Sequence, residues 1–293
     1  MKDVLIKDFS CFSERTLTPD KEVEPLSVQL FRLDAPRWKP LRSRISPIFS
    51  SGKLRDMFPL VMECGDHFES NLEKLVATGE PVECKDIAAK LSIDVIGSCA
   101  FGIEMNALSA ENSEFHRMGR RAFPTDFKAY LKDRLRDYPF LFKHIGRLFL
   151  VDHELVEFFT RIIREAIDYR IEHNFHRHDF IDVLVDLKQH PDKLGVEALE
   201  DEYAAAQAFV FFAAGFETSS LTISHALYEF AQHPEAQEKV RADIKEVLQK
   251  TNGVITYDCI SEMKYLDACL HETLRKYPTL LYLSRMAQSE YTF

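Results

Sequence analysis

The sequence predicts a mainly helical protein that folds as one domain over residues 1–293. Apolar residues recur every three or four positions through most of the chain, which is the spacing of an amphipathic helix. Only 10 glycines and 12 prolines occur among the 293 residues, too few for a loop-rich or β-sandwich protein. Strand-like sequence is nearly absent before Leu280, and no internal repeat or linker divides the chain.

In the first half of the chain, helical patterns alternate with turn signals. One predicted helix contains Trp38. The others cover residues 55–75, 86–100, several shorter pieces within 115–145, and 154–174. The ATGEP sequence at 77–81 is a turn, and the helix over 86–100 ends before Gly102. Pro124 and Pro139 interrupt the aromatic and basic stretch, so the helices there are expected to be short.

The second half is expected to contain the longest helix. A short helix over 179–189 is broken by the PDKLG sequence, and a helix over 201–232 follows. At roughly 1.5 Å per residue this long helix spans about 48 Å. A proline opens the next helix, over 234–250, and the last predicted helix covers 263–277.

Composition restricts the class of protein. The net charge is −10 and the basic residues are dispersed, which argues against a general nucleic-acid binder. Six cysteines occur without a C-x-x-C pair, and we expect buried free thiols in a reducing compartment. The 23 phenylalanines suit a core that also walls an apolar ligand cavity. The N-terminal MKDVLIKDFSCF sequence is neither a signal peptide nor a membrane span.

The HNFHRHDF sequence at 173–180 is rich in histidine, so a metal site has to be considered. No acidic or cysteine partner completes a metal-ligand set there. A solvated loop between two helices is therefore the favoured interpretation, and no metal site is predicted.

Small and polar residues interrupt the long helix where apolar residues would be expected. Ala214 and Thr218 share one stripe, and Gly215 leaves that face without bulk, so a flat ligand could lie against the backbone. The Thr218 hydroxyl can bond the Ala214 carbonyl or open a groove for water, and Glu217 beside it offers a proton source. These features indicate a proton-delivery device. A core helix crossed closely by another helix would need the same small residues, and the sequence leaves both interpretations open.

Two shorter motifs contain further candidates. In HETLRKYP, Glu272 and Arg275 share a helix face. Taken alone, they are best interpreted as a solvated ion pair, although an Arg held by a carboxylate can also donate to backbone carbonyls. In RWKPLRSR, Trp38 and Arg42 lie four residues apart, and an indole N–H with a guanidinium suits a carboxylate-bearing ligand. The alternative is an ordinary amphipathic turn with arginine stacked over the indole.

In order and spacing, these motifs resemble the cytochrome P450 family of haem-thiolate monooxygenases. Trp-x-x-x-Arg precedes a long helix with A-G-F-E-T, and E-T-L-R follows shortly after. The segments EPLSVQLF, SSGKLRDMFP, DVIGSCAFGIEMNAL, RHDFIDVL and LRKYP look like the microsomal insect branch. The resemblance covers essentially the whole chain. It implies a truncated P450 helical fold, from roughly the B helix to just past the K helix.

The resemblance also implies a role for each candidate residue. The helix that contains Ala214 and Gly215 crosses the distal haem face in that family. Two residues match the acid–alcohol pair that delivers protons during oxygen activation: Glu217 and Thr218. Three residues match contacts to the haem propionates: Trp38, Arg42 and Arg285. Two residues match the motif that holds the haem-binding core together: Glu272 and Arg275.

The function implied by the resemblance is oxidation of lipophilic substrates, either xenobiotics or endogenous lipids, with O2 and a haem cofactor. NADPH-cytochrome P450 reductase would supply electrons at the cytosolic face of the endoplasmic reticulum membrane, to which an N-terminal anchor would attach the protein. Residues 11–31 and 115–138 would form part of the pocket wall. Three phenylalanines of the long helix either add to this wall or pack in the core: Phe209, Phe212 and Phe216.

The sequence departs from the family pattern in ways that affect these expectations. The family's haem-ligand Cys lies in a Phe-x-x-Gly-x-Arg-x-Cys-x-Gly loop that residues 1–293 do not contain, and neither do they contain the anchor. Leu281 stands where a second proline is usual. We therefore expect an internal piece of a monooxygenase. We expect it to be inactive alone, because these residues lack the thiolate ligand that favours O–O cleavage in the family. The alternative is a non-catalytic helical protein with a partner-binding role or none.

Overall fold

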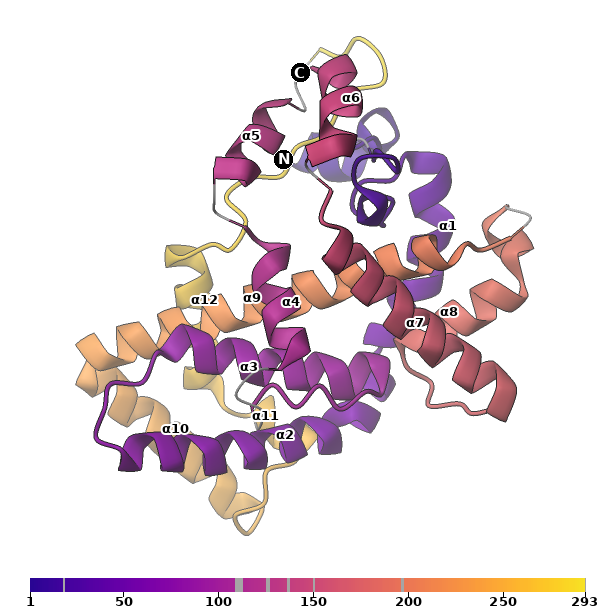
Figure 1. Ribbon diagram of the computed structural model, residues 1–293. Coiled ribbons are helices and arrows are strands. Elements are labelled where there is room, and N and C mark those ends of the chain that lie inside the picture. The colour runs from indigo at the N-terminus through magenta and orange to yellow at the C-terminus, as the bar shows by residue number, and fades with distance from the viewer. Residues whose placement is uncertain are drawn as a thin grey trace.

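The computed structural model describes residues 1–17, 19–108, 113–124, 127–135, 138–149, 151–195 and 198–292. In these residues nearly all regular structure is helical (Figure 1), which confirms the predicted mainly helical fold class. The one β-type contact in the described part is an isolated antiparallel bridge between Glu14 and Met286. The strand-like sequence after Leu280 therefore forms no sheet within this part of the chain.

Twelve α-helices are present in the described residues. They are α1 (Ala35–Ile45), α2 (Ser51–Ala77), α3 (Cys84–Ile96), α4 (Glu114–Ala122), α5 (Phe127–Leu135), α6 (Pro139–Phe149), α7 (His153–His173), α8 (Phe180–Gln189), α9 (Asp201–Gln232), α10 (Pro234–Lys250), α11 (Tyr257–Ile260) and α12 (Lys264–Lys276). Shorter 3₁₀ or π turns are η1 (Asp3–Lys7), η2 (Phe9–Phe12), η3 (Pro25–Ser27), η4 (Ser46–Phe49), η5 (Gly97–Phe101) and η6 (Pro191–Leu194).

The predicted helix boundaries agree best with the structure where a residue such as proline starts or ends a helix. The bounds of α9 and α10 are those expected from the sequence, since Pro234 begins the second helix. The helix predicted over 86–100 is shorter, because α3 passes into the π turn η5 before Gly102, whose φ of 64° is left-handed. The four-residue α11 was missed because one turn carries no periodic pattern.

The long helix α9 is the axis on which the other helices pack. It packs most extensively against α3 and α7, and its C-terminal half reaches α12 (Figure 1). The aromatic rings of Phe212 and Phe216 lie 5.0 Å apart, and Phe159 of α7 lies 5.4 Å from Phe212. These side chains belong to the main core, so packing accounts for Phe212 and Phe216. Burying each such ring stabilises the fold by roughly 1.5–3 kcal/mol.

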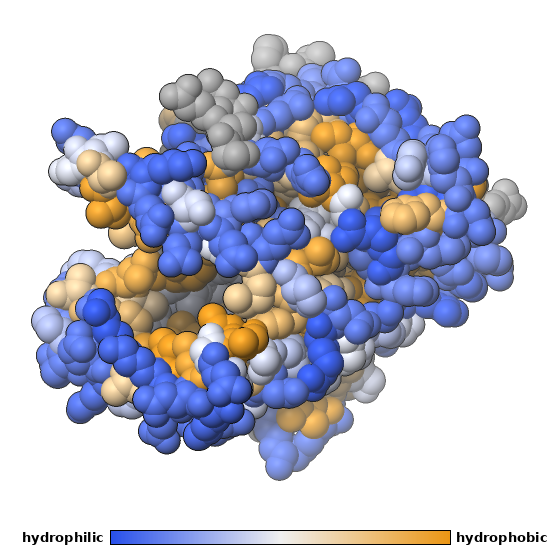
Figure 2. Space-filling model, turned by 90° about the horizontal axis from the view of Figure 1, so that it is seen from below, coloured by the Kyte–Doolittle hydropathy of each residue, from blue (hydrophilic) through white to orange (hydrophobic). Residues whose placement is uncertain are grey.

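Apolar side chains also remain on the surface. Figure 2 shows a hollow lined by hydrophobic residues on the face seen from below, the side on which α2 and α10 lie in Figure 1. The cysteines differ in burial, although all six are free: Cys64 and Cys259 are buried but Cys84 is exposed. The expectation of buried thiols is therefore wrong for Cys84, which begins α3 at the surface, while Cys11, Cys99 and Cys269 are half-buried.

Candidate functional site

The interrupted stretch of α9 has its hydroxyl groups bonded to the helix backbone. The Thr218 Oγ1 donates to the Ala214 carbonyl at 2.6 Å, the first of the two arrangements expected from the sequence. Thr222 and Ser224 repeat the arrangement one turn further, at 2.9 and 2.7 Å. Such back-bonding slightly weakens a helix and often bends it. The Thr218 hydroxyl keeps free lone pairs and can rotate toward a ligand.

The two interpretations of the small residues apply to neighbouring positions. A Cβ built on Gly215 would lie 2.7 Å from Cδ1 of Ile96, the last residue of α3. Close helix crossing therefore explains Gly215, and its predicted role as an open ligand face is not seen. Ala214 is exposed, so the face beside Thr218 is open.

Glu217 has a partner on the crossing helix. Its Oε1 lies 3.2 Å from Nζ of Lys85, the second residue of α3, and the carboxylate side chain is 21% exposed. The acid therefore lies at the solvent border of α9 and α3. This position permits proton exchange with water while the ion pair orients the side chain.

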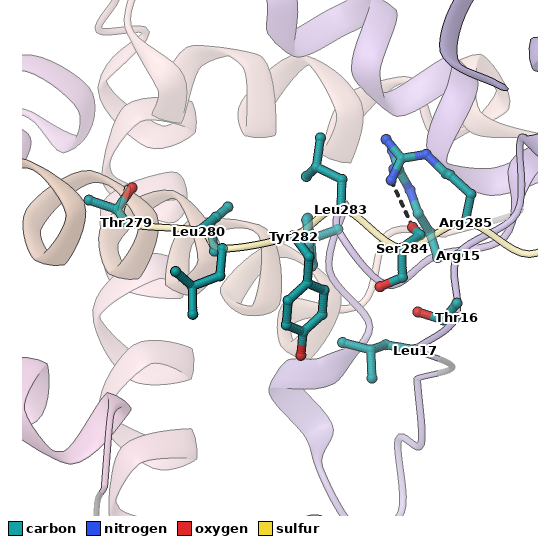
Figure 3. Close-up of a pocket in the computed structure, with 11 residues that line it drawn as sticks. Arg15, Thr16, Leu17, Thr279, Leu280, Tyr282, Leu283, Ser284 and Arg285 are labelled. Atoms are coloured by element: carbon teal, nitrogen blue, oxygen red, sulfur yellow. Dashed lines mark hydrogen bonds between the residues drawn. The ribbon is translucent and has the colours of Figure 1, made fainter. Parts of the chain in front are cut away.

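A pocket of about 330 Å³ lies between residues 15–17 and 279–285 (Figure 3). Arg15 and Arg285 both line it, and the Nε atom of each is buried without a hydrogen-bond partner. Arg285 donates through Nη1 to its neighbour's carbonyl, Ser284 O, at 2.8 Å. The remaining lining is largely apolar and includes Leu280, Leu281 and Leu283.

Arg15 is the residue of this site that sequence reasoning missed. Its guanidinium lies 5.1 Å from the Trp38 ring centroid and 6.0 Å from that of Phe31. Burial lowers the pKa of Arg15, and the positive charges of Arg285 and Arg42 lower it further. The only sequence signal is that Arg15 is the one basic residue between Lys7 and Lys21. This isolated charge does not indicate which residues Arg15 approaches in the folded chain.

Trp38 and Arg42 lie on a helix, α1, as predicted, but the surroundings of their hydrogen-bond donors differ. The Trp38 Nε1–H donates to the Ser13 carbonyl at 3.1 Å, so this indole donor is already engaged. Arg42 is exposed. The cation that stacks over Trp38 from the N-terminal segment is Arg15, and Lys39 also lies 5.9 Å from the ring.

Glu272 and Arg275 form a bidentate pair on α12, with both N–O distances at 2.6 Å. Their side chains are 59% and 71% exposed, as expected for a solvated ion pair. The hydrogen bond from Arg275 lowers the pKa of Glu272. Arg275 donates to no backbone carbonyl within the described residues.

A second contact missed by sequence reasoning fixes α12 to α9. The ring of His225 stacks on Tyr277 at 4.4 Å, with an interplanar angle of 4°. Tyr277 OH and Lys276 Nζ both donate to Oε1 of Glu229, at 2.5 and 2.7 Å. These bonds link the Glu-x-x-Arg helix to the C-terminal half of α9.

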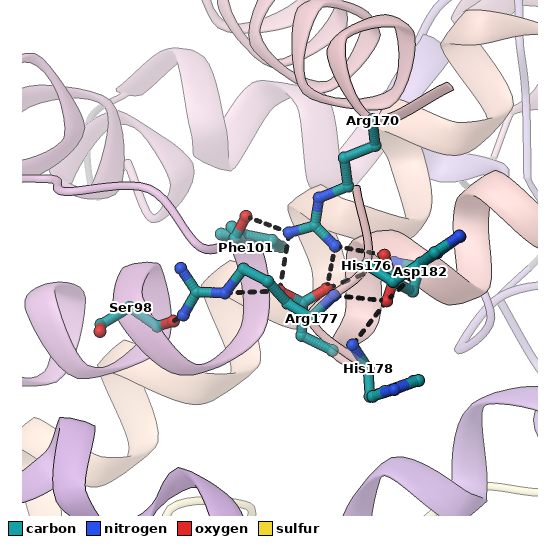
Figure 4. A network of polar contacts seen from close by, with 8 residues as sticks. Ser98, Phe101, Arg170, His176, Arg177, His178 and Asp182 are labelled. Atoms are coloured by element: carbon teal, nitrogen blue, oxygen red, sulfur yellow. Dashed lines mark hydrogen bonds and ion pairs between the residues drawn. The ribbon is translucent and has the colours of Figure 1, made fainter. Parts of the chain in front are cut away.

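A buried ion network joins Asp179, near the end of the histidine-rich segment at 173–180, to Arg170 of α7 and Asp182 of α8 (Figure 4). The Arg170 guanidinium donates to both carboxylate oxygens of Asp179, at 2.5 and 2.7 Å, to Asp182 at 2.6 Å and to the Phe101 carbonyl at 3.1 Å. Asp179 is 4% exposed, so the predicted solvated loop is wrong at this residue. Burial opposes the charge of Asp182, but bonds from the His178 N–H and from Arg170 outweigh it and lower the pKa of this carboxyl.

Two further properties concern the described residues as a set. No group of three or more His, Cys, Asp or Glu side chains is positioned there to hold a metal ion. None of the helices in this part of the chain combines the length and apolar composition needed to span a bilayer.

Comparison with known proteins points to one family. The family model described as Cytochrome P450 matches residues 1–293. The chain is 40% identical to Probable cytochrome P450 6a23, 39% identical to Cytochrome P450 6a8 and 42% identical to Cytochrome P450 6a9, all of Drosophila melanogaster. The matches cover 99–100% of this chain but 58–59% of those proteins, so it spans about three fifths of their length.

Proposed function

The chain belongs to the cytochrome P450 family, a family of monooxygenases, and on that basis we propose that the whole protein is a haem monooxygenase acting on lipophilic compounds. The observation that carries the proposal is the arginine pocket. The Nε atoms of Arg15 and Arg285 are buried there without a hydrogen-bond partner, beside an apolar wall. Apolar pockets with a few converging polar groups are typical ligand sites.

The residues present fit the acidic edge of haem. Buried charge is costly unless it is paired, and Arg15 and Arg285 each have a buried Nε without a hydrogen-bond partner. Carboxylates are the natural partners of guanidinium groups. Arg15, Arg285 and the nearby Arg42 would hold the two propionates, while Trp38 would support Arg15 by stacking.

When bound, haem supplies the oxygen chemistry of this family. The chain's own residues would hold and move protons beside it. Glu217 lies at the solvent border and would take protons from water. Thr218 follows it on the open Ala214 face, and its hydroxyl would turn from the Ala214 carbonyl toward the ligand.

We assign NADPH-cytochrome P450 reductase as the electron donor and the endoplasmic reticulum membrane as the location. Both assignments rest on the family. Two exposed basic residues of α1, Lys39 and Arg44, support an acidic redox partner. Complementary charge of this kind chiefly speeds association.

The test uses a graft in which residues 1–293 replace the aligning segment of Cytochrome P450 6a8. We expect the purified graft to incorporate haem, to show the family's carbon monoxide absorption band after reduction, and to oxidise a lipophilic probe when NADPH and reductase are present. The unaltered 6a8 protein is the control for expression and haem loading. A folded graft that shows the band but forms no product from any lipophilic probe would contradict the proposed activity.

A further inference from the structure

The side chain of Gln207 joins the long helix α9 to residues 28–31, which we call the wall segment. Its Oε1 accepts from the Leu30 N–H at 2.8 Å, and its Nε2 donates to the Val28 carbonyl at 2.7 Å. The same Nε2 donates to the Tyr203 carbonyl at 3.2 Å, one turn earlier on α9. A single amide therefore bonds both a donor and an acceptor of the distant wall segment.

This connection is buried, and every polar group of the amide is used in it. Gln207 is 1% exposed and is the one polar residue of the sequence over 204–214. A glutamine amide offers one carbonyl and two N–H donors, and here the carbonyl and the amino group both have backbone partners. Because buried polar groups are costly to leave unpaired, these bonds hold the wall segment at one place on α9.

Gln207 shares a stripe of α9 with two residues whose face is open. Positions 207, 214 and 218 are spaced by seven and four residues, close to two turns and one turn of about 3.6 residues each. Ala214 is exposed and Thr218 is half-buried. At roughly 1.5 Å per residue, Gln207 lies about 10 Å from Ala214 along the helix axis. The wall segment therefore lies at the N-terminal end of the face beside Thr218.

The wall segment ends in an exposed aromatic ring. Phe31 is 48% exposed and lines the pocket between residues 15–17 and 279–285. Its N–H donates to the Gln29 Oε1 at 2.5 Å, which fixes the backbone directly after the residues that Gln207 holds. An apolar ligand on the face of Ala214 and Thr218 therefore has this segment as its boundary at one end.

We propose that Gln207 is a positioning residue that determines which carbon of a lipophilic substrate is oxidised, because it fixes the wall segment relative to Thr218. This inference rests on the proposed function. Gln207 acts through the wall segment, since its own polar atoms are engaged by the backbone. A displacement of about 1 Å can change a rate by about a hundredfold, so a loosened wall should alter the ratio of products more than their sum.

The first experiment measures amide hydrogen exchange in the 293-residue chain. Gln207→Met keeps the length of the side chain but removes the amide, and should speed exchange at the Leu30 amide by about tenfold. Exchange at the amide of Ile163, a buried residue of α7, should change by less than about twofold. Unchanged exchange at Leu30, or equal acceleration at both amides, would overturn the inference.

Gln207→Glu provides a conservative rescue that depends on pH. A protonated carboxyl has one donor and one acceptor, so it can make both bonds to the wall segment, whereas the carboxylate can only accept. Burial favours the neutral form, so protection of the Leu30 amide should match the original chain at about pH 6 and be lost by about pH 9. Tyr203 stays neutral over this range, because burial raises its pKa to about 12. Loss of protection at both pH values would count against the two bonds and overturn the inference.

The second experiment follows products of the 6a8 graft with n-octylbenzene, an uncharged probe whose chain carbons give separable alcohols. Gln207→Met should retain haem and the carbon monoxide band, while the ratio of alcohols at neighbouring carbons changes by about three- to tenfold. A purely structural role would lower haem content and all products together. An unchanged ratio in a haem-loaded variant would overturn the inference and leave the proposed function intact.

Asn71→Leu is the matched control, because the Asn71 amide of α2 also donates to a distant carbonyl, that of Leu108, at 3.0 Å. This variant should leave the ratio of alcohols unchanged. An equal change of the ratio in Asn71→Leu would mean that general loosening shifts the products, and would overturn the inference. The carbon monoxide band and product assay of the graft without substitutions decide the proposed function before any variant is compared.

Discussion

At the scale of single residues, Gly215 and Ala214 have different surroundings although they are adjacent. Gly215 faces Ile96 of α3, where a side chain would collide, and Ala214 faces solvent beside the Thr218 hydroxyl. Successive helix positions are rotated by about 100° around the axis, so one can serve packing and the next a ligand. Close packing against α3 thus explains Gly215, whereas Ala214 leaves the face beside Thr218 open.

Substituting Gly215→Ala should destabilise the chain by about 1 kcal/mol. Overpacking against Ile96 typically costs about 1–3 kcal/mol, and the better helix propensity of alanine offsets about 1 kcal/mol of this. Adding Ile96→Val, which removes the nearest methyl group, should recover most of the loss in urea unfolding. Gly65→Ala is the control, because that glycine of α2 has open space around it. It should stabilise the chain by about 0.4–1 kcal/mol, and equal effects at the two glycines would refute the close crossing.

Thr218→Val tests the proton-delivery role in the 6a8 graft. The substitution keeps shape but removes the hydroxyl, so haem and substrate should still bind. General acid assistance is typically worth about 10²–10⁴-fold, and we expect product formation to fall at least tenfold while NADPH consumption continues and hydrogen peroxide appears. Thr222→Val is the matched control, since its hydroxyl makes the same bond one turn away. An unchanged ratio of product to NADPH in Thr218→Val would leave only a packing role.

How much of the site the sequence could predict depends on the distance over which each feature acts. The Thr218 bond to Ala214 is local to one helical turn and was one of the two arrangements expected from the spacing. The use of the Trp38 indole by Ser13 and the approach of Arg15 to Arg285 depend on tertiary contacts. No periodicity in a single sequence encodes such contacts, so these features were not predicted.

At the scale of elements, the joint between α7 and α8 depends on one buried cation. Arg170 lies in the last turn of α7 and neutralises Asp179, the N-cap of α8, and Asp182 in its first turn. The same guanidinium bonds the Phe101 carbonyl at the end of η5. One side chain therefore connects three elements. The sequence predicted both helices but not this joint, because a charged residue in a polar loop is usually solvated.

Arg170→Ala should cost about 3–5 kcal/mol of unfolding free energy, because it leaves buried carboxylates without a counter-charge. Arg164→Ala, an exposed change on the same helix, should alter stability by less than about 0.5 kcal/mol. The pKa of Asp182 is lowered in the folded chain, so its charge contributes stability above the unfolded pKa of about 3.9 that is lost as pH falls.

The pH dependence gives Arg170→Ala a second signature. Without the guanidinium, protonation relieves the unpaired carboxylates, so the stability difference from the original chain should shrink as pH falls from about 7 to about 3. Urea unfolding at several pH values measures this difference. A difference that stays constant over this range would mean that the loss comes from packing and not from charge.

At the scale of the whole molecule, helix order was easier to predict than helix contact. The positions of α2, α7, α9 and α10 followed from periodicity and helix-ending residues. Which helices meet, and where the ends of the described chain lie, depends on how apolar faces pair in three dimensions. The same pairing leaves an apolar strip uncovered at residues 280–283, each of which is 58–83% exposed.

This strip should make the 293-residue chain associate. Contiguous exposed apolar surface favours contact between molecules at roughly 25 cal/mol per Å² buried. Leu281 and Tyr282 are 83% and 79% exposed, so changing both to serine should raise the concentration at which association begins by about tenfold in sedimentation velocity. The unfolding free energy should change by less than about 0.5 kcal/mol, since little of the surface of these two side chains is buried in the folded chain.

Val254→Ser, which changes a 59% exposed residue between α10 and α11, is the control and should leave association unchanged. If the double variant associates like the original chain, contact must occur elsewhere, and the hollow seen in Figure 2 becomes the next surface to alter.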